Sequence, residues 1–299
     1  EGGLVDWGEG GRFGESLASI GDVNGDGIPD LAIGALYDKD SLGAVYIVHL
    51  DTNGTVKYQS KISPKEGPYF SNILNGSFAK NIENMGDVNG DGNFDLLVSM
   101  DVPQVWLIYL GENQEVIGSR SYGVLTDSVF YEVFGNVLDN PILVSSIPDL
   151  NQDGIKEMIV SRNDEYGDLK AGVFFINEFG EIIDYSLLNM DVFAPSPTAL
   201  GDQNVFVSFL GDINNDYYPE ISIGASPWRM TGNLSSSSLF ALTVKPEKCL
   251  NDCVWPGDAN NDGIVNSRDV LQMGCSFWQN SDKKRIMALT SWVEQHCDD

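Results

Sequence analysis

A short acidic loop, written D-x-N-x-D, recurs five times along the chain and constrains its fold more than any other feature. The first four copies begin at Asp22, Asp87, Asp149 and Asp212, so consecutive copies start 65, 62 and 63 residues apart. A near-constant period of this length is typical of repeat architectures, in which each repeat forms one supersecondary unit. The fifth copy begins at Asp258 and stands in a different sequence context.

The loops carry oxygen-bearing side chains at alternate positions, and a hard cation such as Ca²⁺ takes six to eight oxygen ligands. Asp, Asn and Gly are also common turn residues, but five matches in one chain favour calcium binding. We therefore predict four calcium sites in the repeats and one near the C-terminus. The predicted ligands in the repeats are the side chains at loop positions 1, 3, 5 and 9 and the backbone carbonyl at position 7: Asp22, Asn24, Asp26, Ile28 and Asp30; Asp87, Asn89, Asp91, Asn93 and Asp95; Asp149, Asn151, Asp153, Ile155 and Glu157; Asp212, Asn214, Asp216, Tyr218 and Glu220.

Each of these four loops joins two apolar segments, which predicts a β-hairpin braced by the metal. A third apolar run follows in every repeat, and in the first three a turn and a fourth run come after it. Four strands per repeat are typical of a β-propeller blade. The alternative, a β-sandwich of short strands, does not account for a metal loop at constant spacing. The predicted fold is all-β, a propeller of about four blades over residues 1–245, with repeats at about 1–65, 66–127, 128–190 and 191–245.

The first repeat resembles a known family. Residues 13–35, from Phe13-Gly14 through the loop to Gly34-Ala35, resemble the FG-GAP repeat of integrin α-subunit propellers and of many bacterial surface proteins. Repeat two keeps Phe78 and the loop, whereas repeat three has its Phe134-Gly135 displaced by six residues. The resemblance implies a calcium-braced propeller that acts in extracellular recognition, and it names no ligand.

Repeat four runs into Pro246 and Cys249 where its fourth strand is expected. Two ways of covering the resulting strand edge stay open. The N-terminal segment Leu4 to Trp7 of the same chain supplies the missing strand, or the edge pairs with another chain and the protein self-assembles.

The fifth loop belongs to a second predicted unit, residues 246–299. Its sequence fits the twelve-residue EF-hand frame, with Gly263 at position 6, and resembles the first half of a dockerin, a module that binds cohesins on scaffolding proteins. No second half-repeat follows, so a structural EF-hand-like cap is an equal alternative. A capped amphipathic segment over residues 281–296 predicts an α-helix there. The predicted calcium ligands are Asp258, Asn260, Asp262, Ile264, Asn266 and Asp269.

The cysteines and sequons favour an extracellular location. All four cysteines, Cys249, Cys253, Cys275 and Cys297, lie in the predicted C-terminal unit, where they favour one or two disulfides over a zinc site. N-glycosylation sequons begin at Asn53, Asn75 and Asn233. No apolar run of membrane-spanning length and no signal peptide is present in the sequence, which favours a processed, secreted or cell-surface chain without direct membrane insertion.

The excess of acidic over basic residues disfavours some classes of function. With 44 acidic and 17 basic residues, the net charge of −27 disfavours nucleic-acid binding. No nucleophile–base set, G-x-S-x-G or H-E-x-x-H motif is evident, so a catalytic site is not predicted. The leading hypothesis is a calcium-binding propeller for adhesion, recognition or assembly, with an extracellular protein or glycan as ligand. The alternatives are a scaffold component bound through the dockerin-like unit and a polysaccharide-active enzyme.

Overall fold

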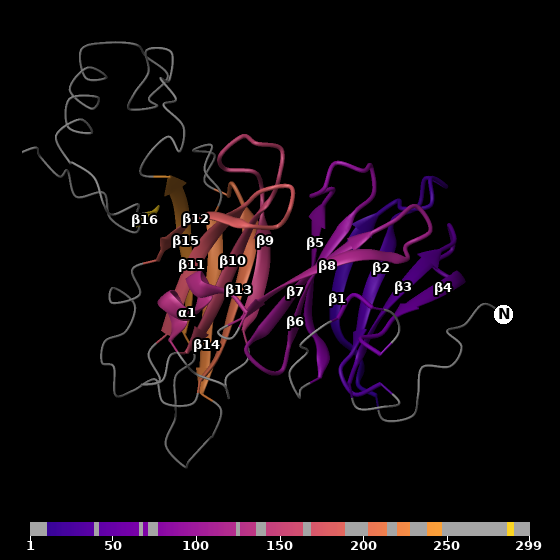
Figure 1. The fold of residues 1–299 in the computed structure, drawn as a ribbon, viewed down its shortest axis with the longest axis horizontal. Coiled ribbons are helices and arrows are strands. Elements are labelled where there is room, and N and C mark those ends of the chain that lie inside the picture. The colour runs from indigo at the N-terminus through magenta and orange to yellow at the C-terminus, as the bar shows by residue number, and fades with distance from the viewer. Residues whose placement is uncertain are drawn as a thin grey trace, which may run out of the picture.

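The structure is a computed structural model that describes residues 11–38, 42–65, 68–70, 77–123, 126–135, 142–163, 169–188, 203–213, 220–227, 238–246 and 286–289. The described residues form four antiparallel sheets of four strands each and one short helix. Figure 1 shows the first two sheets on the right and the last two on the left. The predicted all-β fold is confirmed as β-propeller-like, and each sheet is called a blade below.

Each blade runs in simple chain order, because every strand pairs with the one before it and the one after it. The strands are β1 (Phe13–Gly21), β2 (Asp30–Ala35), β3 (Ala44–Leu50) and β4 (Val56–Ile62) in blade one; β5 (Phe78–Gly86), β6 (Asp95–Met100), β7 (Gln104–Leu110) and β8 (Val116–Gly123) in blade two; β9 (Leu143–Ile147), β10 (Glu157–Asn163), β11 (Leu169–Ile176) and β12 (Ile182–Leu187) in blade three; β13 (Gln203–Gly211), β14 (Glu220–Pro227), β15 (Ser238–Pro246) and β16 (Ile286–Leu289) in blade four.

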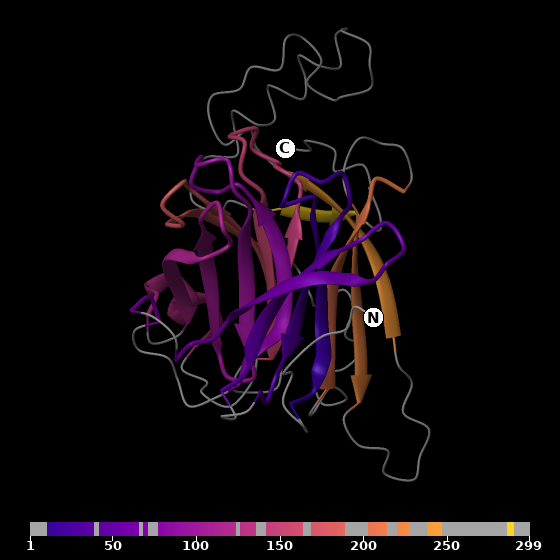
Figure 2. The same ribbon diagram turned by 90° about the vertical axis from the view of Figure 1, so that its right-hand side faces the viewer.

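The first strands of the blades, β1, β5, β9 and β13, lie side by side and hold successive blades together. Figure 2 shows the same arrangement turned by 90°. Several hydrogen bonds between blades join residues 63 or 65 positions apart, which matches the repeat length. Lys80 Nζ donates to Glu15 Oε1 at 2.8 Å, and Val144 N–H donates to Asn81 Oδ1 at 3.2 Å. The sequence period is therefore also the period of the contacts between blades.

The hydrophobic core lies between the blades. One buried cluster joins blade one to blade two and includes Val45, Ile47, Val98 and Trp106. The central strands β3, β6 and β7 are buried along almost their whole length, because both faces of each are covered. The outer strands β4 and β8 are largely half-exposed. This difference explains why the second and third apolar runs of each repeat are continuous in sequence while the fourth is more polar.

Gly34, in the Gly-Ala pair of the first repeat, permits a close approach of blades one and two. A Cβ atom on Gly34 would lie only 2.7 Å from the carbonyl oxygen of Ala79 and 2.2 Å from Ser16 Oγ. Ser16 Oγ in turn donates to that same carbonyl at 2.9 Å. A side chain at position 34 would therefore push the two blades apart.

Helix α1 (Ser128–Phe134) precedes blade three and was not predicted from the sequence. Asp127 caps its N-terminus by accepting the N–H groups of Val129 and Phe130. Phe130, Val133 and Phe134 are buried in the cluster between blades two and three. Phe134-Gly135 thus ends a helix instead of beginning a strand, which explains its displacement from the Phe-Gly position.

Blade four corrects two predictions. Its fourth strand is β16, which pairs antiparallel with β15 from Thr243↔Leu289 to Pro246↔Ile286. The edge of β15 is therefore covered by Ile286–Leu289, and neither Leu4 to Trp7 nor a second chain is needed there. The helix predicted over residues 281–296 is wrong for these four residues, because their backbone groups pair with the exposed edge of β15. The rest of that segment lies outside the described residues.

Candidate calcium loops and the acids beneath them

The first three D-x-N-x-D loops have the same internal geometry. Loop one (22–30), loop two (87–95) and loop three (149–157) each connect the first and second strands of a blade. In each, a backbone N–H group donates to the side-chain oxygen of a residue earlier in the loop. The glycine at position 6 has a φ of 84°, 90° and 92° in the three loops, a left-handed backbone that favours glycine.

These hydrogen bonds follow one pattern. The acid at position 1 accepts the N–H groups of positions 5 and 6, Asn at position 3 accepts that of position 5, and the acid at position 5 accepts that of position 7. In loop one the distances are 2.9 Å for Asp26 N to Asp22 Oδ1, 2.6 Å for Gly27 N to Asp22 Oδ2, 2.9 Å for Asp26 N to Asn24 Oδ1 and 3.0 Å for Ile28 N to Asp26 Oδ1. Loops two and three repeat all four bonds within 2.7–3.1 Å.

This donor set fits a hard cation. Each loop gathers two carboxylates and one amide carbonyl on a single tight turn, and backbone hydrogen bonds fix all three side chains. Carboxylate and amide oxygens are the ligands that Ca²⁺ prefers. Counting only His, Cys, Asp and Glu, no group of three or more side chains within the described ranges converges closely enough to hold a metal.

The acid at position 9 is placed differently from the acids at positions 1 and 5. It is buried beneath the loop and accepts the N–H of loop position 2. Asp30 and Asp95 also accept an N–H from the last residue of the third strand, at 3.0 Å from Leu50 and 3.0 Å from Leu110. The bonds to position 2 come from Val23, Val88, Leu150 and Ile213 and measure 3.4, 2.8, 2.9 and 2.8 Å.

Position 9 therefore acts as a clamp that ties the loop to the interior of its blade. In the described structure its carboxylate binds backbone amides, and its role as a calcium ligand stays a prediction. Burial raises the pKa of Asp95 to about 6, although the N–H groups of Leu110 and Val88 oppose the rise. Burial likewise raises the pKa of Glu157 to about 8, and the nearby charge of Asp149 adds to the effect. Ionising either carboxyl in the calcium-free fold is therefore costly.

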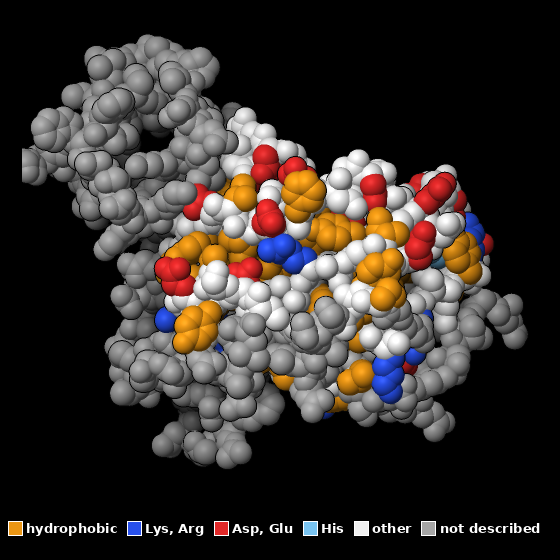
Figure 3. All heavy atoms as spheres, in the orientation of Figure 1, with side chains coloured by type: hydrophobic (Ala, Val, Ile, Leu, Met, Phe, Trp, Pro, Cys, Tyr) orange, Lys and Arg blue, Asp and Glu red, His pale blue; other side chains and the backbone are white. Residues whose placement is uncertain are grey.

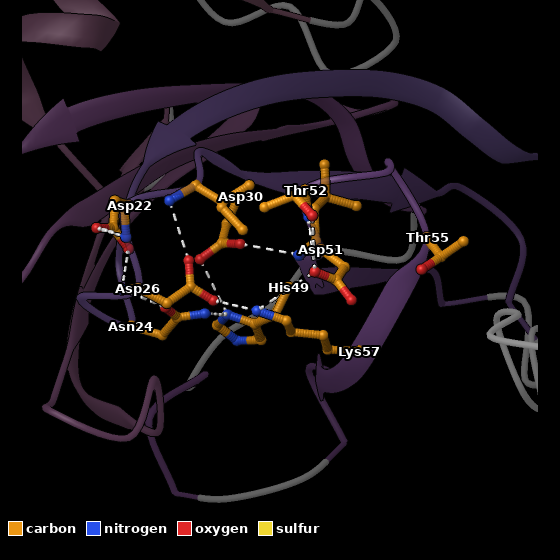
Figure 4. Close-up of polar contacts among 12 residues, drawn as sticks. Asp22, Asn24, Asp26, Asp30, His49, Asp51, Thr52, Thr55 and Lys57 are labelled. Carbon is orange, nitrogen blue, oxygen red and sulfur yellow. Dashed lines mark hydrogen bonds and ion pairs between the residues drawn. The ribbon is translucent and has the colours of Figure 1, made fainter.

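Loop one differs from the other two in its surroundings, and Figure 4 shows loop one with the residues around it. His49, fully buried on β3, has its Nδ1 3.0 Å from Asp30 Oδ2 and 3.2 Å from Asn24 Nδ2. Its ring stacks on Tyr58 with centroids 4.0 Å apart. Lys57 on β4 places its Nζ 2.7 Å from Asp26 Oδ2. This hydrogen bond is the main reason why the pKa of Asp26 is lowered and that of Lys57 is raised.

The remaining predicted ligands are only partly described. In loop four, Asp212 and Glu220 are described, and Glu220 accepts the N–H of Ile213 as in the other repeats. Asn214, Asp216 and Tyr218 lie outside the described residues. The whole of loop five, Asp258 to Asp269, lies outside them too, as do the four cysteines.

Sequence reasoning missed His49 and Lys57. His49 and Lys57 lie 19 and 27 residues after the end of loop one at Asp30, and only the register of β3 and β4 brings them to the loop. One signal was available in the sequence. Lys57 is a cation at a position where the next two repeats have Ile117 and Ile183.

Figure 3 shows acidic side chains along the upper edge of the face that it draws, with few basic ones among them. Among the described residues, no helix has both the length and the apolar character needed to span a membrane.

Comparison with known proteins connects blade one to a family. Residues 13–48 match the model of the FG-GAP repeat. These residues span β1, loop one, β2 and most of β3, and they include the acid clamp at Asp30. The match therefore includes the whole of loop one.

Several integrin α-subunits are similar to part of the chain. Integrin alpha-2 of Mus musculus is 32% identical over 99 residues, which cover 32% of this chain and 8% of that protein. Integrin alpha-4 of Xenopus laevis is 34% identical over 95 residues (29% and 8%), and integrin alpha-6 of Homo sapiens is 40% identical over 65 residues (22% and 6%). The chain thus matches less than a tenth of the length of each relative.

A solved structure of a protein of unknown function from Bacteroides caccae overlaps 67% of this chain and 56% of its own, with 9% identity and a TM-score of 0.29. This likeness is too weak to carry an argument. Residues 13–48 are similar to an FG-GAP repeat, and about a third of the chain or less is similar to integrin α-subunits.

Proposed function

We propose that this protein is a calcium-binding propeller that acts outside the cell, in adhesion, recognition or the assembly of a surface structure. The observation that carries the proposal is the recurrence of one loop geometry in three blades. Independent turns have no reason to repeat four hydrogen bonds at the same loop positions unless the side chains they fix share a role. The similarity to integrin α-subunits supports an extracellular setting.

In this proposal, the side chains at positions 1, 3 and 5 and the carbonyl at position 7 hold the ion, and the acid at position 9 positions the loop. The bound ion supplies positive charge that offsets repulsion among the loop carboxylates. It also raises the stability of each hairpin, because a ligand that binds only the folded state stabilises it by mass action. The rigid loops then provide a surface for a protein or glycan ligand.

Calcium binding is tested by equilibrium dialysis of the full chain against radioactive ⁴⁵Ca²⁺ at millimolar free calcium. Wild type is compared with a variant that carries Asp22→Asn, Asp87→Asn and Asp149→Asn together, since these substitutions remove one charge from each described loop. We expect the variant to bind one ion fewer for each altered loop. Equal binding by the two proteins would remove the basis of the proposal.

The recognition role is tested separately, by screening the calcium-loaded protein against arrays of glycans and of extracellular matrix proteins. Binding that disappears in chelator and in the triple variant is the expected result. Degradation of a polysaccharide on the same array would instead support the enzymatic alternative.

A further inference from the structure

The ammonium group of Lys57, on the fourth strand of blade one, contacts a carboxylate of loop one. Lys57, the second residue of β4, has its Nζ 2.7 Å from Asp26 Oδ2 and 4.0 Å from Asp51 Oδ1. Figure 4 shows the side chain reaching from the strand to the carboxylate. The other Asp26 oxygen accepts the N–H of Ile28 at 3.0 Å. Lys57 therefore occupies the carboxylate oxygen that the loop backbone leaves unused.

The register of the strands identifies the matching residues in the next two blades. Val56, Val116 and Ile182 each pair with the last residue of the preceding strand, namely Leu50, Leu110 and Ile176. The next residue is Lys57 in blade one, Ile117 in blade two and Ile183 in blade three. Both isoleucines are exposed and carry no charge.

In loops two and three, the same carboxylate oxygen accepts a neutral donor from inside the loop. Asn89 Nδ2 donates to Asp91 Oδ2 and Asn151 Nδ2 donates to Asp153 Oδ2, each at 2.9 Å. A neutral amide leaves the negative charge of the loop in place, and its oxygen is itself a possible ligand for a cation. An ammonium group neutralises one carboxylate and can never serve as a ligand.

We propose that Lys57 is a tethered cation that competes with Ca²⁺ for loop one, so that this loop fills at higher calcium than loops two and three. The inference rests on the calcium binding proposed above. An incoming divalent ion must either displace the ammonium group from Asp26 or bind beside a like charge, and both lower its affinity. Displacement would free the Lys57 side chain from loop one while β4 stays paired with β3, a change that has no counterpart at Ile117 and Ile183.

The size of the effect follows from the exposure of the pair. The side chains of Lys57 and Asp26 are 35% and 27% exposed, so water and salt screen their attraction. We therefore expect removal of the Lys57 charge to tighten calcium binding by loop one about two- to fivefold.

The test is isothermal titration of the full chain with Ca²⁺, comparing wild type with Lys57→Met, Lys57→Ile and Lys57→Arg. Lys80→Met is the matched control. Lys80 forms an ion pair with Glu15 at 2.8 Å, its side chain is 31% exposed, and it contacts no calcium loop. We expect both neutral Lys57 variants to tighten one class of sites about two- to fivefold, and Lys57→Arg and Lys80→Met to change every class less than twofold.

A second titration assigns the effect to loop one. In an Asp26→Asn background, Lys57→Met should no longer tighten any site. If Lys57→Met and Lys80→Met act equally, or if the gain persists in the Asp26→Asn background, the competition proposed for Lys57 is wrong while calcium binding stands. If wild type and every variant bind no Ca²⁺ at millimolar concentration, the proposed function itself fails and this inference fails with it.

Discussion

Replacing Asp95 with alanine should destabilise blade two even when no calcium is present. Asp95 is fully buried, its Oδ2 accepts the Val88 N–H at 2.8 Å, and its Oδ1 accepts the Leu110 N–H at 3.0 Å. The substitution leaves both donors without an acceptor in the interior. Each unsatisfied buried donor costs about 1–3 kcal/mol.

Part of that loss is offset. Because burial raises the pKa of Asp95 to about 6, the charged carboxyl is itself costly in the fold at neutral pH. We therefore expect the free energy of unfolding to fall by about 3 kcal/mol instead of the full sum. For a domain of this size, such a loss lowers the melting temperature by roughly 6–12 °C.

Asp91→Ala is the matched control, four residues earlier in the same loop. Asp91 is exposed, so water replaces the hydrogen bonds that its carboxylate makes, and we expect a change below about 1 kcal/mol in chelator. The assay is thermal unfolding in excess chelator, followed by tryptophan fluorescence, since Trp106 is buried in the same blade. If Asp95→Ala and Asp91→Ala melt at the same temperature, the acid at position 9 does not clamp the loop.

Four other predictions follow from the same structure and sequence. Burial raises the pKa of Glu157 from 4.5 to about 8, so its contribution to the free energy of unfolding is present below pH 4.5 and is lost as pH rises through 8. Wild type in chelator should therefore melt at a higher temperature at pH 5 than at pH 8, and Glu157→Gln should narrow that difference. Met287→Pro should weaken blade four and speed amide exchange in β15, because proline lacks the N–H needed for a strand ladder, whereas unchanged exchange would argue against β16. Asp26→Ala should reduce calcium-dependent stability more than Asp216→Ala, judged from melts with and without calcium, because loop four has Tyr217 where the others have glycine. Thiol titration of denatured, unreduced protein should find no free cysteine, and four free thiols would contradict the disulfides expected in residues 249–297.

The repeats could be predicted from the sequence because their signals are local. Each loop lies within nine residues, and the apolar runs beside it become the strands that it joins, as in β1 and β2. The four hydrogen bonds repeated among loop positions 1 to 7 connect residues at most five positions apart. A pattern confined to one turn is visible in sequence before any tertiary contact is known.

The surroundings of the loops could not be predicted, because they depend on strand register. Asp30 contacts Leu50 and His49, which lie 20 and 19 residues later in the sequence. Lys57 contacts Asp26, which lies 31 residues earlier. A one-residue shift of β3 or β4 would turn these side chains to the opposite face of the sheet. The backbone hydrogen bonds of the position-9 acid from the third strand were therefore not visible in the sequence, and its predicted role as a fourth ligand side chain stays a prediction.

The ends of the repeat array were hardest to predict. β16 follows β15 by 39 residues, and its short sequence, Ile286-Met287-Ala288-Leu289, suits a helix as well as a strand. Its pairing is decided by the open edge of β15, which is a tertiary contact. Helix α1 carried a readable signal in its Asp127 cap and its apolar residues at 130, 133 and 134, but a helix between blades interrupts the repeat pattern.

The most direct test of the central claim is the melting temperature of the wild-type chain in millimolar Ca²⁺, in Mg²⁺ at equal ionic strength and in excess chelator. At a calcium concentration 100 times the dissociation constant, each filled site adds about 2.7 kcal/mol to the free energy of unfolding. We therefore expect a clear rise in calcium, since the described structure has three loops of matching geometry, and a much smaller rise in magnesium. Superimposable melting curves in calcium and in chelator would contradict the calcium-braced propeller.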